Sequence, residues 1–363
     1  MRRQFLFVLM IVFSLLPTPA QATSTRAPIV MTNRYAANES VRIIVTLRND
    51  YSPGYSALSA PQLASRHATV TRQVHSFRDR NRALFATVHR EFNVFPILAV
   101  TVMGRDIERI AGLPEVARIE EDQARPAALD ESGEVIHSRA VVEGGYAGAG
   151  STVVVFDTGV KSDHPFLHGR VIAEACFSTN NPNLQITSLC PRGTTFETGP
   201  GAAAPCATLC DHGTHVAGII AGQRMCLDCD TDNQMQMSGV APDANIIAVQ
   251  VFSLYNNDRT CRNAGQGGAP CVLSWDSDIQ AAMQWVFNNR NAASWGRVAA
   301  INMSLGAGQF FRACDAQNAT YATWISQLRS VEIASVIASG NASFTNAVAS
   351  PACIQSAVTV VQP

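Results

Sequence analysis

Three polar residues in this chain have the types needed for chemistry at a carbonyl group: Asp157, His212 and Asn341. A histidine can take a proton from an attacking hydroxyl, and an aspartate can hold the imidazole in one tautomer and stabilise its charged form. A side-chain amide can donate a hydrogen bond to an oxyanion. The chemistry requires the three side chains to meet in space, although they are far apart in sequence.

The flanking segments predict how the fold brings them together. Residues 151–156 form an apolar run of strand length directly before Asp157, and residues 333–338 form another before Ser339-Gly340-Asn341. Such runs suit parallel strands buried on both faces, whose carboxyl ends share one edge of a sheet. We therefore expect the carboxylate and the amide at the same edge.

His212 stands at the start of a predicted helix, residues 211–222. Its Gly218, Ala221 and Gly222 have almost no side chain, so the helix can pack closely on a sheet. Glycine in an exposed helix costs roughly 1 kcal/mol relative to alanine. Close packing therefore explains these residues better than helix propensity does.

The order of the motifs resembles that of the subtilisin-like serine peptidases (subtilases). The matching motifs are Asp157-Thr158-Gly159, His212-Gly213-Thr214-His215-Val216-Ala217-Gly218 and Ala338-Ser339-Gly340-Asn341. The resemblance implies hydrolysis of peptide bonds through an Asp-His-Ser triad, with Asp157 and His212 in the triad and Asn341 in the oxyanion hole. A fourth match, residues 301–306, is similar to the family's substrate-lining strand. It implies a cleft lined by Ser304, Leu305 and Gly306, whose backbone pairs with an extended polypeptide.

The nucleophile of this family is a serine in a Gly-Thr-Ser-(Met/Ala)-Ala sequence that opens a long helix. No Gly-Thr-Ser occurs in the 363 residues, and Ser343, Ser350 and Ser356 do not stand in a glycine-flanked turn before a helix. We expect the chain to stop before the serine, through a gene break, a frame change or a partial record. As written, it is expected to be inactive and, with apolar strand faces near Ala334 and Val358 uncovered, poorly soluble.

The chain is predicted to consist of a signal peptide and two domains. Residues 1–22 have a charged start, a short apolar run and an Ala-Gln-Ala cleavage site, typical of the general secretory route; Arg2-Arg3 leaves a twin-arginine signal as the alternative. We expect a secreted or periplasmic protein, with no membrane contact after cleavage. The net charge of −1 argues against a nucleic-acid partner.

Residues 38–123 are predicted to form a small α+β module. Strands are expected at 41–47, 95–102 and 116–122, with helices at 64–91 and 104–111, from the apolar spacing. This pattern resembles the inhibitory propeptide in front of many subtilases, with a ferredoxin-like fold. The resemblance implies a module that helps the enzyme domain to fold and acts as its intramolecular inhibitor, with a tail at residues 122–129 in the cleft.

Residues 135–363 are predicted to form the peptidase domain, a doubly wound parallel α/β sheet of subtilisin type that is incomplete at its C-terminus. The basis is the alternation of strands and helices, which implies right-handed crossovers. Beyond the strands before Asp157 and Asn341, strands are expected at 246–252, 298–303 and 357–361, and helices at 276–289 and 320–331.

All ten cysteines lie in this second domain, and an even number in an exported chain indicates disulfides. Short pairings, Cys226–Cys229 and Cys261–Cys271, are expected, although sequence leaves the connectivity open. The alternative is a zinc site formed by Cys206, Cys210, Cys226 and Cys229. The family resemblance implies no required cofactor; relatives often hold structural calcium, for which the sequence shows no clear ligand set.

Two functions of different classes remain. The first is an exported subtilisin-type endopeptidase, made as an auto-inhibited precursor. The second is a non-catalytic pseudopeptidase or protease-binding module. Retention of Asp157, His212 and Asn341 together favours the first, because binding alone requires none of this chemistry. A zinc-dependent hydrolase is excluded, since the chain has no His-Glu-x-x-His sequence.

Overall fold

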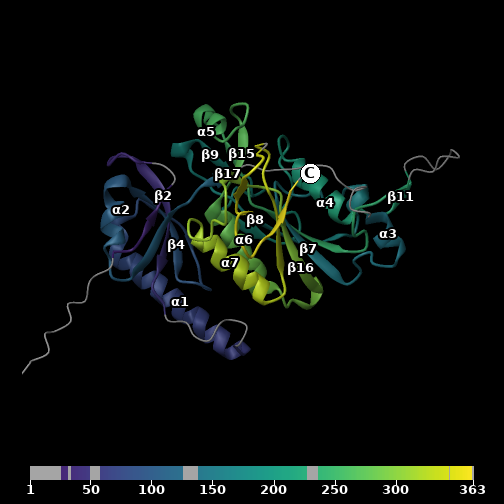
Figure 1. Cartoon of the computed structure of the whole chain (residues 1–363), viewed down its shortest axis with the longest axis horizontal. Helices are drawn as coiled ribbons and strands as arrows, with labels where there is room; N and C mark the ends of the chain where they lie inside the picture. Colours follow the sequence, from purple (N-terminus) through teal and green to yellow (C-terminus); the bar gives the residue numbers. More distant parts are fainter. Residues whose placement is uncertain are drawn as a thin grey trace, which may run out of the picture.

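The structure is a computed structural model that describes residues 26–31, 34–49, 58–125, 138–226, 236–342 and 344–361. The predicted signal peptide lies outside the described residues. The chain forms an N-terminal α+β domain, purple and blue in Figure 1, and a larger α/β domain, teal to yellow. The two domains lie side by side, and their sheets contribute to one shared apolar core.

The N-terminal domain is a five-stranded sheet in the order β1-β5-β2-β4-β3. The strands and helices are β1 (Ile29–Val30), β2 (Ser40–Leu47), α1 (Ala60–Asn81), η2 (Arg82–Leu84), β3 (Thr87–Glu91), β4 (Ile97–Met103), α2 (Gly104–Ala111) and β5 (Val116–Glu121). Strands β2 to β5 with their two helices have the βαββαβ order of ferredoxin-like folds. One face of this sheet packs on Val70, Val74 and Phe77 of α1 and on α2.

One prediction for this domain was wrong: residues 64–91 are not a single helix. The helix α1 ends at Asn81, and Thr87–Glu91 form strand β3, which pairs antiparallel with β4. Val88 continues the apolar spacing of the helix, but it lies on this edge strand and is 36% exposed. Pairing with the next strand, β4, overrides the local periodicity.

The central sheet of the second domain has seven strands in the order β10-β8-β13-β7-β16-β18-β20. Their bounds are β7 (Ser151–Asp157), β8 (Val171–Phe177), β10 (Phe196–Thr198), β13 (Asn245–Gln250), β16 (Arg297–Met303), β18 (Ala334–Ala338) and β20 (Val358–Val360). All neighbouring pairs are parallel except β10 with β8. The predicted parallel α/β sheet is thus confirmed, with an antiparallel strand added at one edge.

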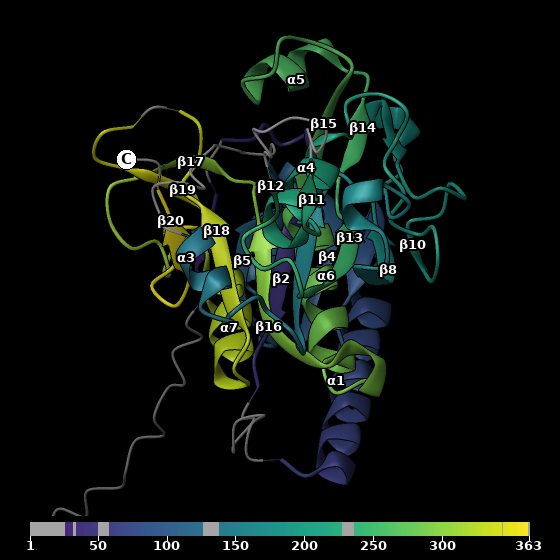
Figure 2. The same ribbon diagram turned by 90° about the vertical axis from the view of Figure 1, so that its right-hand side faces the viewer.

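Helices cover both faces of this sheet. Figure 2 shows α4 (His212–Ala221) on the near face, with α6 (Asp276–Asn289) behind the sheet. Along β7, Val154 and Phe156 pack with α6 and α7 (Ala319–Ser330), whereas Val155 packs with α4. This alternation follows from the two-residue period of a strand. The remaining helices are α3 (Ser138–Glu143), η3 (Pro165–Leu167), η4 (Pro182–Leu184), α5 (Asp258–Asn263) and η5 (Ala293–Trp295).

Three smaller sheets join the loops. The largest has the order β6-β15-β14-β9, formed by β6 (Ala124–Arg125), β15 (Cys271–Trp275), β14 (Ser253–Tyr255) and β9 (Ile186–Ser188). The other two are the pairs β11 (Met225–Cys226) with β12 (Gln236–Met237), and β17 (Ala307–Phe310) with β19 (Val348–Ser350). The sequence analysis did not predict these short strands. Strand β6 follows the N-terminal domain, so the four-stranded sheet joins both domains.

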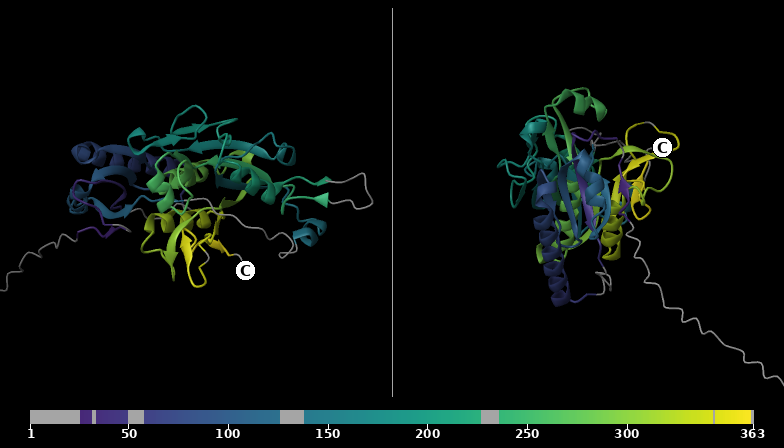
Figure 3. Two further views of the ribbon diagram at one scale, coloured as in Figure 1. Left: turned by 90° about the horizontal axis from the view of Figure 1, so that it is seen from above. Right: turned by 90° about the vertical axis from the view of Figure 1, so that its left-hand side faces the viewer.

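The inner face of the N-terminal sheet packs against α6 and α7. Ile44, Phe92 and Ile97 from that sheet belong to the same buried cluster as Met283 and Trp324. The right-hand panel of Figure 3 shows the purple and blue strands in front of the green α/β domain. The N-terminal sheet therefore has α1 and α2 on one face and the second domain on the other, and both faces are buried.

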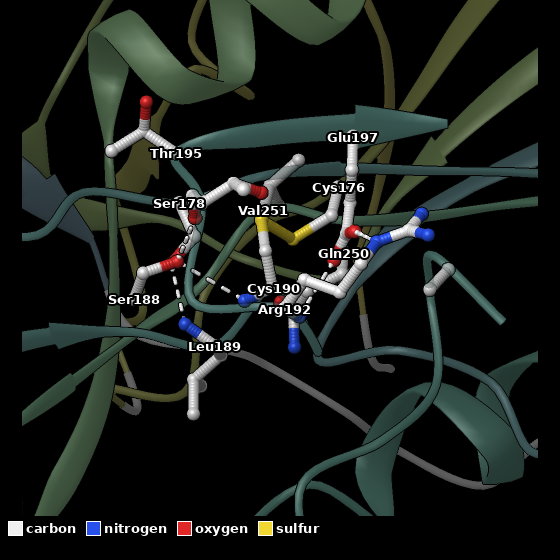
Figure 4. The surroundings of a disulfide bond; sticks show 12 residues. Cys176, Ser178, Ser188, Leu189, Cys190, Arg192, Thr195, Glu197, Gln250 and Val251 are labelled. Carbon is white, nitrogen blue, oxygen red and sulfur yellow. Dashed lines mark hydrogen bonds and ion pairs between the residues drawn. A yellow bond between two sulfur atoms is a disulfide. The ribbon is translucent and has the colours of Figure 1, made fainter. Parts of the chain in front are cut away.

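Four disulfides are present among the described residues: Cys176–Cys190, Cys206–Cys210, Cys261–Cys271 and Cys314–Cys353. The predicted Cys261–Cys271 pairing is confirmed; the predicted Cys226–Cys229 pairing lies outside the described residues. Figure 4 shows the first of these bonds, beside an ion pair of 2.5 Å between Arg192 and Glu197. The first disulfide ties Cys176 of the central strand β8 to the loop that follows β9.

The β18–β20 end of the central sheet is more exposed than its middle. The side chains of Val358 and Val360 are each 51% exposed, and Ala334 and Val336 are half-buried. Among the residues that the structure describes, no helix is both long and apolar enough to cross a bilayer.

Candidate active site

Asp157 is the last residue of β7, the middle strand of the central sheet. Strands β13 and β16 flank β7, so the carboxylate is only 1% exposed. Its Oδ1 accepts a hydrogen bond of 2.7 Å from the Thr158 backbone N–H. This bond stabilises the ionised form of a carboxylate that is otherwise removed from water.

His212 is the first residue of α4, directly after its N-cap Asp211. Its Nδ1 lies 2.7 Å from Asp157 Oδ1, and 18% of its side chain is exposed. Since an ionised carboxylate only accepts hydrogen bonds, Nδ1 carries the hydrogen and Nε2 is the basic ring nitrogen. The two residues, which lie 55 positions apart, thus have the geometry of a general base with its orienting carboxylate.

Gly213 explains how the helix comes so close to the strand end. A Cβ atom at this position would lie 2.2 Å from the Gly159 carbonyl oxygen and 3.0 Å from Asp157 Oδ1. The Gly213 N–H also donates to Thr158 Oγ1 at 3.1 Å. Any side chain here would push α4 away from β7 and lengthen the contact between His212 and Asp157.

The strand register places Asn341 at the same edge of the sheet. Phe156 pairs with Met303 and Met303 pairs with Ile337, so Asp157 and Ala338 lie in one row across the sheet, on two strands separated by β16. Parallel strands lie about 4.8 Å apart, which puts these two backbone positions roughly 10 Å apart. Asn341 follows three residues beyond β18 and is exposed.

The turn before Asn341 is held by the neighbouring strand. The Ser339 N–H donates to the Val360 carbonyl at 2.8 Å, and the Ala349 N–H donates to the Ser339 carbonyl at 2.8 Å. Gly340 has a φ of 104°, a left-handed conformation that favours glycine. Glycine at position 340 is therefore what this turn requires, whatever role Asn341 has.

The segment Ser304-Leu305-Gly306 follows β16 at this edge. Leu305 is fully buried in the core, so only its backbone can face a ligand. Ser304 Oγ accepts a hydrogen bond of 3.0 Å from Asn302. A Cβ at Gly306 would lie 3.0 Å from the Ser350 carbonyl oxygen, so Gly306 allows close packing against β19.

A cavity of about 480 Å³ opens at His212. Thr158, Leu209 and His212 line one side, and residues 266–272 line the other. The sequence analysis missed this second wall. A signal was present, because Gly-Gln-Gly-Gly-Ala-Pro stands between two cysteines that a short disulfide joins; such a loop is rigid and has little side-chain bulk.

Two of the three serines that the sequence analysis rejected as nucleophiles, Ser350 and Ser356, form hydrogen bonds away from His212. Ser350 Oγ donates to Asn318 Oδ1 at 3.0 Å, and Ser356 Oγ lies 3.0 Å from Ser326 Oγ. Ser343 lies outside the described residues. These contacts agree with the interpretation that Ser350 and Ser356 are not nucleophiles.

The alternative of a zinc site is not supported, because two of its four expected ligands, Cys206 and Cys210, are joined to each other by a disulfide. Within the described ranges no group of three or more His, Cys, Asp or Glu side chains is placed to hold a metal ion.

Comparison with known proteins agrees with this geometry. The family model of the subtilase family matches residues 148–362. Subtilisin E of Bacillus subtilis (strain 168) is 24% identical over 285 residues, which cover 73% of this chain and 59% of that protein. Subtilisin-like protease 3 of Pseudogymnoascus destructans is 32% identical over 161 residues, 44% of this chain and 27% of that protein.

Among solved structures, the epidermin leader peptide processing serine protease of Staphylococcus aureus has a TM-score of 0.50 at 14% identity. The match covers 88% of this chain and 69% of that chain, and at this identity it supports the fold alone. Because the family model covers more than half of the chain, the protein belongs to the subtilase family. The chain spans 59% of the length of subtilisin E.

Proposed function

We propose that this chain provides the acid–base part of an exported subtilisin-type serine endopeptidase. The observation that carries the proposal is the 2.7 Å contact between His212 Nδ1 and the buried Asp157 carboxylate, at the mouth of a cavity. Membership of the subtilase family supports the same reaction. The substrates would be extended polypeptides.

In this reaction His212 Nε2 takes the proton of a serine hydroxyl as its oxygen attacks the peptide carbonyl carbon. Asp157 keeps the imidazole in the required tautomer and stabilises the imidazolium. Asn341 would donate its side-chain N–H to the oxyanion. His212 then gives the proton to the leaving amine, and water hydrolyses the acyl-enzyme. The 363 residues contain no Gly-Thr-Ser, so we expect them to have no peptidase activity by themselves.

We further propose that residues 38–123 are an inhibitory propeptide domain. Its Glu120 accepts hydrogen bonds from the N–H groups of Ala319 (2.6 Å) and Thr320 (3.2 Å), at the start of α7. Its Asp122 accepts one from the Ser277 N–H at 2.9 Å, at the start of α6. Carboxylates at helix N-termini are stabilising because they meet unpaired N–H groups and the positive end of the helix dipole.

The tail of this domain supports an inhibitory role. Strand β6 pairs antiparallel with β15, Ala124 with Trp275 and Arg125 with Ser274. The same β15 contributes Cys271 and Val272 to the cavity at His212. A tail added as a strand beside this cavity occupies the edge at which an extended substrate would pair. The rest of the predicted tail, to residue 129, lies outside the described residues.

Export through the predicted signal peptide is also part of the proposal. The four disulfides support it, because such bonds persist in oxidising compartments.

Casein hydrolysis tests the reaction, with the chain expressed together with the downstream Gly-Thr-Ser segment that the peptidase proposal requires. His212→Ala should reduce the rate at least a thousandfold, whereas His168→Ala, an exposed histidine of the same domain, should leave it unchanged. Equal activity of the two variants would overturn the proposal.

The second candidate is a non-catalytic pseudopeptidase or protease-binding module, which the absence of Gly-Thr-Ser from these residues favours only if the natural chain ends at Pro363. Sequencing the genomic DNA past the codon for Pro363 and translating all three frames distinguishes the two. A Gly-Thr-Ser-x-Ala sequence downstream favours the peptidase, and its absence favours the binding module.

A further inference from the structure

A second cavity, of about 770 Å³, lies on the other side of Leu209 from His212. Its walls come from four elements: α4, the loop 205–211, the turn around η3, and the end of β12 with Ser238. It contains neither Asp157 nor His212. Neither the proposed reaction nor the contacts of the N-terminal domain assign a role to it.

The walls of this cavity are mainly apolar. Leu209, Ile219 and Met237 line it and are 46%, 39% and 42% exposed. Phe166 and Leu167 form its floor. Large apolar side chains that gather around a concave surface, each from a different element, indicate a binding site rather than scattered surface residues.

The cavity is built from fixed parts. The Cys206–Cys210 disulfide closes the loop that carries Leu209. Phe166 lies against Gly218, where a Cβ would be only 3.3 Å from its ring, and its carbonyl accepts from the Gln223 N–H at 2.8 Å. On the other side, the Val240 N–H donates to the Ile219 carbonyl at 2.8 Å. A preformed pocket loses little entropy when a ligand binds.

Leu209 connects this cavity to the one at His212, because it lines both. Its backbone has a φ of 70°, which is rare for a residue other than glycine and costs of order 1–3 kcal/mol. The disulfide-closed loop holds Leu209 in this conformation, between the two hollows. A chain bound at His212 can therefore continue across Leu209 without leaving the surface.

We propose that the second cavity binds a large apolar side chain of the polypeptide substrate, whose backbone crosses Leu209 from the cavity at His212. This inference rests on the proposed function, and it adds a preference for a bulky apolar residue at a distance from the cleaved bond. Lys161, His164 and His215 stand at the same cavity and can hydrogen-bond the peptide groups beside that side chain. A volume of this size accepts a phenylalanine or leucine side chain.

The first test asks whether the site exists, independently of catalysis. Full-length chain is titrated with N-acetyl-phenylalaninamide and N-acetyl-alaninamide by ligand-observed NMR. The phenylalanine probe should bind about tenfold or more tightly, as expected for burial of an aromatic side chain. Ile219→Gln, and independently Met237→Gln on another element, should reduce this ratio below about threefold, while Leu184→Gln, an equally exposed leucine elsewhere, should leave it unchanged.

Three outcomes would overturn the inference. One is equal binding of the two probes, and another is a preference that survives both Ile219→Gln and Met237→Gln. The third is a preference lost in Val272→Gln instead, which would place the side chain in the cavity at His212. Thermal unfolding of each variant confirms that it is folded.

The second test asks whether the occupant is substrate. Casein is cleaved by the chain extended with a downstream Gly-Thr-Ser segment, with and without Ile219→Gln, and the fragments are mapped by mass spectrometry. Large apolar residues should be enriched at one position on one side of the cleaved bonds, and Ile219→Gln should remove the enrichment. Cleavage without enrichment overturns this inference alone. Absence of cleavage by the chain extended with a downstream Gly-Thr-Ser segment overturns the proposed function, and the NMR result then decides whether the cavity binds.

Discussion

Two of the regions that bury charged groups, the candidate active site and the junction of the domains, are built differently. At the candidate active site, Asp157 is buried but its partner His212 lines a cavity, with 18% of its side chain exposed. At the junction of the domains, Arg42 binds Asp122 at 2.6 Å and Arg90 binds Asp278 at 2.6 Å; the two carboxylate side chains are 0% exposed and the arginines 6% and 13%.

Further hydrogen bonds satisfy the charged groups at the junction of the domains. Thr179 Oγ1 accepts from Arg42 at 3.0 Å and donates to Asp278 at 2.8 Å. Arg42 also bonds to Ser277 and stacks over the Trp275 ring at 4.2 Å. A buried network with its partners satisfied holds two surfaces in one register, whereas His212 lines a cavity. We therefore expect substitutions at the candidate active site to reduce activity more than stability, and substitutions at the junction to reduce stability more than activity.

The largest expected effect is on activity alone. Asp157→Asn keeps the size of the side chain but favours the wrong tautomer of His212. In the chain extended with a downstream Gly-Thr-Ser segment, the rate of casein hydrolysis should therefore fall about 10⁴-fold. The free energy of urea unfolding of the full-length chain should change by less than about 1.5 kcal/mol, because the amide can still bond to the imidazole. A stability loss as large as at the junction would break the comparison.

The next effect is on stability alone. Arg90→Met leaves Asp278 buried with only the bond from Thr179, and removing one partner of a buried pair costs about 3 kcal/mol or more. Arg262→Met is the matched control, because Arg262 pairs with Asp258 on the surface, where both are more than half exposed, and such pairs contribute less than about 1 kcal/mol. If the two variants lose equal free energy of unfolding in urea, the ion pair between Arg90 and Asp278 does not behave as a buried pair.

A smaller effect, on both stability and activity, is expected for a substitution at Gly213. Gly213→Ala places a Cβ 2.2 Å from the Gly159 carbonyl, and overpacking of this kind costs about 1–3 kcal/mol. It also moves His212 from Asp157, so activity should fall with stability. Gly112→Ala, where a Cβ would lie 3.4 Å from its nearest neighbour, should change neither. Urea unfolding and casein hydrolysis of the two variants check this.

The smallest effect is a pH dependence at the junction. Burial, with the charges of Arg42 and Arg90 nearby, lowers the pKa of His89 to about 2, and its Nε2 lies 2.7 Å from Thr101 Oγ1. The unfolded chain therefore binds a proton below about pH 6.5 that the folded chain does not. The stability from neutral His89 is complete above that pH and is lost as the pH falls toward 2.

Between pH 7 and pH 5 this group should cost about 1–2 kcal/mol. His89→Gln keeps a hydrogen bond to Thr101 but does not titrate, so the variant should lose less stability than the parent chain over this interval. Urea unfolding at both pH values measures the difference. Identical losses would show that His89 is not buried as a neutral group.

Much of the fold follows from local pattern. The helices at 104–111 and 276–289 have the predicted bounds, because their apolar spacing, first turns and flanking strands agree with each other. The strand ending at Asp157 and the helix beginning at His212 were predicted for the same reason. The mistaken helix across residues 82–91 shows the limit, since partner β4 decides that β3 is a strand.

The sequence by itself determined the class of the protein, the parallel order of its main strands and the residue types at the catalytic edge, because these depend on short motifs and on periodicity. Tertiary structure decided the contact between Asp157 and His212, the close approach at Gly213, the wall at residues 266–272, the pairing of β6 with β15 and both cavities. Each of these joins segments tens of residues apart, and local propensity carries no information about which distant segments meet.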